Sequence, residues 1–110
     1  MRAYSDHIGL TVGNVEFYRK LANFLGFRIV KESDHSVGFH CGNTEIWVRK
    51  VDDEHAANGY DRENIGLNHL AFGVDSVAGV DRFYREFMQP NSLSDLYGGP
   101  KEYPQYEPGY

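Results

Sequence analysis

Two histidines stand at equivalent places in a repeated pattern of the sequence, and they are the first candidates for chemistry. His7 and His69 each come directly before residues in which apolar side chains alternate with polar or small ones, a pattern that predicts a strand. If the two repeats pair about a pseudo-twofold axis, the faces that carry the histidines converge. Imidazole is the commonest transition-metal ligand, so the repetition favours a shared metal site, although a single strand histidine is more often structural or exposed.

Glu45 is the candidate third ligand, because it lies on another expected strand and alternates there with Trp47 and Arg49. Two histidines and one carboxylate bind divalent Zn, Ni, Mn or Fe and leave coordination positions open for a substrate. A solvated carboxylate on the surface of a sheet explains Glu45 equally well, and that alternative stays open.

The remaining histidines and the cysteine are weaker candidates. His35 stands in a predicted turn, where we expect it to be exposed, and His55 stands in a polar linker, where we expect it to be solvated. His40 and Cys41 are adjacent on a predicted strand, so they point to opposite faces and do not form a metal site together. We expect Cys41 to be a small buried apolar residue.

The elements that must position these residues follow from the periodicity of the first 51 residues, which predicts one module with the order β-α-β-β-β. Asn14 is the expected N-cap of the helix and Gly26 the expected residue after its end. Gly42-Asn43 is expected to form a tight hairpin turn. The expected strands cover residues 6–12, 27–31, 37–41 and 44–49, and the expected helix covers residues 15–25.

The second half of the chain repeats the beginning of the first after a polar stretch. Residues 52–66 carry no clear period and are interpreted as a linker or a functional loop. Residues 68–74 then copy the pattern of residues 6–12, and Phe83-Tyr84-Arg85 follows as Phe17-Tyr18-Arg19 does in the first half. Two landmarks in the same order predict an internal duplication.

The second module, residues 67–110, is predicted to be incomplete. It holds the repeated strand and a helix from Ser76 to about Met88, followed by a tail rich in Pro, Gly and Tyr. Proline removes a donor from a strand ladder, so this tail is a poor source of sheet. We therefore expect an α+β fold of two β-α-β-β-β modules, the second incomplete. We expect the natural protein to continue beyond Tyr110 with the missing strands, and the alternative is that another chain covers the exposed sheet.

Composition excludes several classes of protein. Eleven basic side chains against sixteen acidic ones give a formal charge of −5, which disfavours a nucleic-acid partner. No apolar run approaches the roughly 20 residues that span a bilayer, and the N-terminus lacks the apolar region of a signal peptide. Cys41 is the single cysteine, so no disulfide forms within the chain, and we expect a cytoplasmic protein.

The two histidine strands and their Phe-Tyr helices resemble the vicinal oxygen chelate superfamily, which includes glyoxalase I, fosfomycin-resistance thiol transferases, extradiol dioxygenases and bleomycin-binding proteins. The resemblance covers essentially the whole chain. It implies two β-α-β-β-β modules whose curled, antiparallel-rich mixed sheets enclose a metal site. The residues that carry it are His7-Ile8-Gly9-Leu10-Thr11-Val12 with Phe17-Tyr18, and Asn68-His69-Leu70-Ala71-Phe72-Gly73-Val74 with Phe83-Tyr84.

The resemblance also implies a ligand set. His7 and His69 match the histidines that metal-using members take from the first strand of each module, and Glu45 matches a glutamate of glyoxalase-like members. A further glutamate, from the last strand of the second module, has no counterpart before Tyr110, so we expect the fourth ligand to lie beyond it. Members commonly pair modules across chains, which implies a homodimer.

Two functions remain open at this point. The first is a glyoxalase-like, metal-dependent enzyme of lyase, isomerase, thiol-transfer or dioxygenase type. In it the metal polarises substrate oxygens, and either Glu45 or the glutamate expected beyond Tyr110 acts as a base. The second is a non-catalytic small-molecule binder of the bleomycin-resistance type. Its aromatic cleft would be lined by Trp47, Phe39 and Phe72, with Tyr60 as a further candidate.

Overall fold

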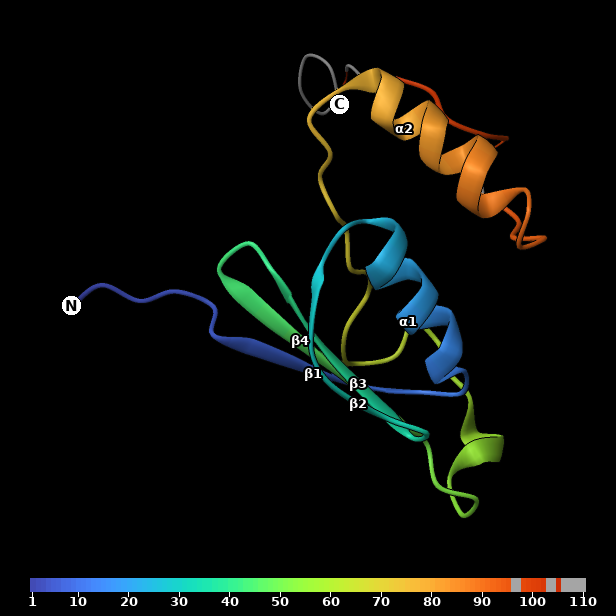
Figure 1. Cartoon of the computed structure of the whole chain (residues 1–110). Helices are drawn as coiled ribbons and strands as arrows, with labels where there is room; N and C mark the ends of the chain where they lie inside the picture. The colour runs from blue at the N-terminus through green and yellow to red at the C-terminus, as the bar shows by residue number, and fades with distance from the viewer. Residues whose placement is uncertain (96–97, 103–104, 106–110) are drawn as a thin grey trace. The chain divides into compact units, whose positions relative to one another are not determined.

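The computed structural model describes residues 1–95, 98–102 and 105 of the chain. These residues divide after Gly66 into two units, Met1–Gly66 and Leu67–Tyr110. Each unit is described by itself. The first unit holds the sheet and helix α1, and the second holds helix α2 (Figure 1).

The first unit is built on a four-stranded mixed sheet with the strand order β1-β4-β3-β2. Strand β1 (His7–Val12) is parallel to β4 (Thr44–Lys50). Strand β3 (Ser36–Cys41) is antiparallel to β4 and also to β2 (Arg28–Ser33). The predicted order β-α-β-β-β and the α+β class are therefore confirmed for the first half of the chain.

Helix α1 (Val15–Phe24) begins at the predicted residue and ends one residue before the predicted end, with Leu25 as its C-cap. The Asn14 side chain accepts a hydrogen bond from the Phe17 backbone N–H at 3.1 Å, as an N-cap does. After the helix, Gly26 has φ +75°, a left-handed conformation that glycine adopts without steric cost. The chain can therefore turn directly from α1 into β2.

The core of this unit lies between α1 and one face of the sheet. Val37, Phe39, Ile46 and Val48 are each at most 2% exposed, and Ala22 of α1 is completely buried. The rings of Phe27 and Phe39 add a stacked pair with centroids 5.8 Å apart. Because side chains alternate across a strand, covering these residues with α1 sends their neighbours to the opposite face.

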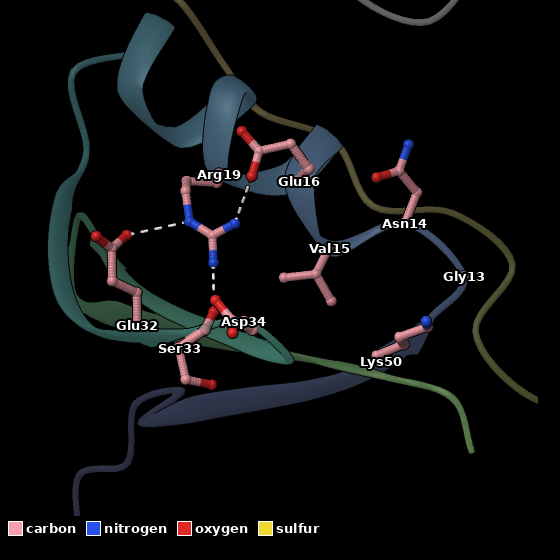
Figure 2. A pocket seen from close by; sticks show the side chains of 9 residues that line it. All are labelled: Gly13, Asn14, Val15, Glu16, Arg19, Glu32, Ser33, Asp34 and Lys50. Atoms are coloured by element: carbon pink, nitrogen blue, oxygen red, sulfur yellow. Dashed lines mark hydrogen bonds and ion pairs between the residues drawn. The ribbon is translucent and has the colours of Figure 1, made fainter. Parts of the chain in front are cut away.

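Arg19 ties α1 to the β2–β3 hairpin (Figure 2). Its guanidinium donates to Glu16 at 2.6 Å, to Glu32 at 3.2 Å and to the Ser33 carbonyl oxygen at 2.6 Å. The hydrogen bond to Glu16 is the largest of the effects that raise the pKa of Arg19 above its ordinary value. Arg19 therefore fixes the helix against the hairpin as a permanently charged group.

In the described part of the second unit, one continuous helical stretch consists of two segments. Helix α2 (Val77–Phe83) is capped by the Ser76 hydroxyl, which accepts from the Gly79 N–H at 3.0 Å. It continues as the π-helical segment η2 (Tyr84–Met88), in which Phe87 is buried and stacks on Phe83 at 5.1 Å. The predicted helix from Ser76 to about Met88 is confirmed.

The strand predicted over residues 68–74 is not formed in the described structure, where this segment pairs with no other strand. The prediction rested on alternation and on the repetition of residues 6–12, and such a pattern sets which side chains share a face but supplies no hydrogen-bonding partner. The segment keeps exposed apolar residues, among them Leu70 and Val74.

Truncating Phe39 should reveal how much of the stability resides in this core. Phe39→Ala is expected to lower the free energy of unfolding by about 3–5 kcal/mol, because it removes a buried ring and leaves a cavity. Ile65→Ala, at a fully exposed position, should change it by less than about 0.5 kcal/mol. Urea unfolding followed through the fluorescence of Trp47 measures both. A loss below about 1 kcal/mol for Phe39→Ala would show that the ring is not part of the core.

Candidate functional site

The face of the sheet turned away from the core carries the predicted site residues of the first unit. We call it the open face. The strand register places residues of neighbouring strands opposite one another, and paired residues project to the same side. The open face comprises His7, Gly9 and Thr11 of β1, Glu45, Trp47 and Arg49 of β4, and Ser36, Gly38 and His40 of β3.

His7 and Glu45 are direct partners across the parallel pair β1 and β4. Neighbouring strands lie about 4.8 Å apart, so two partners on one face can reach a common ligand. The Nδ1 atom of His7 lies 2.8 Å from a carboxylate oxygen of Asp6. That contact orients the ring and leaves Nε2 as the nitrogen that can bind a ligand, an arrangement typical of metal-binding histidines.

The carboxylate of Glu45 has a polar neighbour on each of its two oxygens. Trp47 donates its indole N–H to Oε1 of Glu45 at 3.1 Å. On the next strand, Nδ1 of His40 lies 3.7 Å from Oε2 of the same carboxylate. About a third of the Glu45 side chain is exposed. Glu45 is therefore accessible, and one of its carboxylate oxygens is bonded to Trp47.

Trp47 stands between two glycines, Gly9 on β1 and Gly38 on β3. Its indole lies against Gly38, where an added Cβ would come within 2.5 Å of the ring. An added Cβ on Gly9 would meet nothing within 4 Å. The open face is thus filled by the indole on the β3 side and bare on the β1 side, next to His7.

The predicted residues of the second unit are described by themselves. His69 is exposed, with Nδ1 2.9 Å from the Asn68 side-chain oxygen, and Phe72 is half-buried. The first unit by itself brings together His7 and Glu45. Within the residues that the structure describes, no three His, Cys, Asp or Glu side chains form a group able to hold a metal ion.

The imidazole of His7 and the carboxylate of Glu45 are donor groups of the types that bind a divalent metal. They are two of the three predicted ligands. An imidazole nitrogen and a carboxylate oxygen are the ligands that Zn, Ni, Mn and Fe accept together. The contacts from Asp6 to His7 and from Trp47 to Glu45 are the supporting hydrogen bonds that such ligands need.

Phe39 does not line the open face, so its predicted part in an aromatic cleft has to be withdrawn. It is 1% exposed and packs in the core against Phe27. Its partner in the register is Ile46, which is buried on the same side. Of the predicted aromatic residues, Trp47 lies on the open face, and Tyr60 is 69% exposed in the stretch after β4.

His40 is the residue that sequence reasoning passed over. From the sequence, His40 was tested only as a metal ligand together with Cys41, and adjacent strand residues point to opposite faces. The predicted hairpin turn at Gly42-Asn43 already implied the register in which Cys41 pairs with Thr44 and His40 with Glu45, and the structure has that register. Counting outward from the turn would have placed His40 opposite Glu45 on the open face.

Cys41 and His55 stay outside the candidate site. Burial raises the pKa of the Cys41 thiol above its ordinary value, so the less reactive protonated form is favoured. His55 is engaged by Asp52, whose carboxylate oxygen lies 2.6 Å from Nδ1.

A hollow of about 640 Å³ lies beside the beginning of α1 (Figure 2). Its lining is dominated by the ion pairs of Arg19 with Glu16 and Glu32. The donors of Arg19 are already directed at these carboxylates and at the Ser33 carbonyl oxygen. The guanidinium in this hollow therefore attaches α1 to the hairpin.

Three comparisons with known proteins bear on the family of this chain. The family model of the Glyoxalase/Bleomycin resistance protein/Dioxygenase superfamily matches residues 5–91. A solved structure described as a "putative glyoxalase" from Bacillus halodurans superposes with a TM-score of 0.76. The two sequences are 24% identical, and the match covers 90% of this chain and 82% of that chain, so the likeness shows the fold. No curated protein matches the chain.

The unequal surroundings of the two glycines give a direct test of the open face. Gly38→Ala should lower the free energy of unfolding by about 1–3 kcal/mol and shift the emission of Trp47, because the new methyl group displaces the indole. Gly9→Ala is the matched control on the other side of Trp47, where the methyl group meets open space. Urea unfolding and emission spectra measure both. Equal effects of the two substitutions would contradict the described position of the indole.

Proposed function

The chain belongs to the Glyoxalase/Bleomycin resistance protein/Dioxygenase superfamily, and we propose that its open face binds a small oxygen-bearing substrate through a divalent metal ion held by His7, Glu45 and His69. We further propose that the complete protein is a glyoxalase-like enzyme. The single observation that carries this proposal is the register of β1 and β4, which pairs His7 with Glu45 on a face that α1 leaves free.

The roles of the residues follow from their contacts. His7 would bind through Nε2 while Asp6 holds the ring by Nδ1. Glu45 would bind through its carboxylate, or would accept a carbon-bound proton from the substrate, with its orientation set by the indole N–H of Trp47. A bound metal would supply Lewis acidity toward adjacent substrate oxygens.

His69 and a partner chain enter the proposal because the first unit offers only two ligands. We propose a homodimer, in which pairing between modules completes the ligand set. Strand β1 stands at the edge of the sheet and pairs on one side with β4, so among the described residues its other side is free for a further strand. In line with the sequence reasoning, we propose a cytoplasmic protein. None of the described helices is long and apolar enough to cross a membrane.

A non-catalytic binder is the second candidate, and one observation favours it. The indole of Trp47 beside the bare surface of Gly9 offers a flat apolar wall with open space next to it, which suits a planar ligand. In such a protein, ligand would bind without metal. The predicted Phe72 could contribute from the second unit, whereas Phe39 is buried in the core.

Metal binding by the full chain distinguishes the two functions. We expect Ni²⁺ to bind with an affinity that falls at least about tenfold in His7→Ala and in Glu45→Gln, since each substitution removes a proposed ligand. His35→Ala is the control, because His35 is exposed in the β2–β3 turn. Isothermal titration of purified protein with NiCl₂ measures these affinities.

An unchanged affinity in both variants, or an equal loss in His35→Ala, would contradict the proposed ligands. If the native chain takes up no Ni²⁺, Zn²⁺ or Mn²⁺ at all, metal-dependent function fails and the binder becomes the better account. Retention of affinity in His69→Ala would confine the site to the first unit.

A further inference from the structure

We infer that His40 is a positioning residue for Glu45, fixing the orientation of the carboxylate that the proposed function uses as ligand or base. The role of ligand or base rests on the proposed function. The contact between His40 and Glu45 is observed within the first unit alone. His40 lies on β3, Glu45 on β4, and the two are direct partners in the antiparallel register.

The imidazole of His40 carries a polar atom without a hydrogen bond. Its Nδ1 is buried, and nothing in the described part of the chain bonds to it, although 39% of the side chain is exposed. A buried polar atom without a partner costs free energy. Oε2 of Glu45 lies 3.7 Å from this nitrogen, which is too long for a hydrogen bond.

The two oxygens of Glu45 therefore face two different nitrogen atoms. Oε1 accepts from Trp47 at 3.1 Å, and Oε2 faces Nδ1 of His40. The last torsion of a glutamate side chain is soft, so a small rotation of the carboxylate brings Oε2 within bonding distance of Nδ1, in the ring tautomer that carries its proton on that nitrogen. Ligand binding at Glu45 would then tighten a contact for which the free protein is already arranged.

Trp47 alone cannot fix the carboxylate, because a single hydrogen bond leaves it free to pivot about Oε1. A second donor on Oε2 removes that freedom and still leaves lone pairs on both oxygens for a ligand. Donors of this kind, one step removed from a ligand, commonly change metal affinity by 10- to 100-fold when they are deleted.

The first experiment reads the carboxylate without any metal. The chain has one tryptophan, so the Trp47 indole N–H gives a single resonance whose solvent exchange reports its bond to Glu45. His40→Leu should speed this exchange at least threefold, because the carboxylate loses its second anchor. His40→Asn should exchange as the native chain does, since the asparagine amide nitrogen stands where Nδ1 stood. Should His40→Leu fail to fold, His40→Ala takes its place.

The second experiment measures Ni²⁺ affinity in the same variants. We expect a loss of about tenfold or more in His40→Leu and recovery to within about threefold of the native value in His40→Asn. Equal indole exchange in native, leucine and asparagine forms would overturn the inference whatever the metal result. So would an asparagine variant as impaired as the leucine variant, which would indicate a packing role. If the native chain binds no Ni²⁺ while the exchange pattern holds, His40 positions Glu45 and only the proposed metal function fails.

Discussion

Helix α1 covers one face of a four-stranded sheet, and the rest of the first unit depends on that one-sided cover. Side chains alternate along a strand, so burying Ile46, Val48 and Phe39 under the helix forces Glu45 and its neighbours to the opposite face. The cap at Asn14, the glycine at the end of α1 and the Arg19 ion pairs all hold the helix in that place. The polar surface is a consequence of how the apolar core is closed.

Strand pairing turns this separation into a chemical arrangement. A parallel partner gives Glu45 the imidazole of His7, and an antiparallel partner gives it the imidazole of His40. The hairpin at 42–43 sets the second of these pairings, because its length leaves one register. Trp47 then bonds to the carboxylate and lies flat on Gly38, which has no side chain to displace the ring. The same indole therefore packs on Gly38 and donates a hydrogen bond to Glu45.

Local pattern was enough to predict most of the first unit. Alternation indicated all four strands, Asn14 and Gly26 marked the ends of the helix, and His7 and Glu45 were named as residues of one site. The sequence pattern was insufficient where the structure depends on which elements pack or pair with one another. Phe39 was expected in a cleft because alternation does not say which face is covered. Residues 68–74 alternate in polarity but pair with no strand in the described structure. The hydrogen bonds of Arg19 to Glu32 and Ser33 join residues that no sequence motif connects.

The central claim is that the open face, centred on His7 and Glu45, is where this chain binds its ligand. Paramagnetic broadening by Mn²⁺ in the amide spectrum of the full chain tests it most directly. The account predicts that signals of His7, Gly9 and Glu45 and the indole of Trp47 broaden first, at the lowest added Mn²⁺. Broadening centred instead on the acidic stretch 52–55, with the open face unaffected, would contradict it.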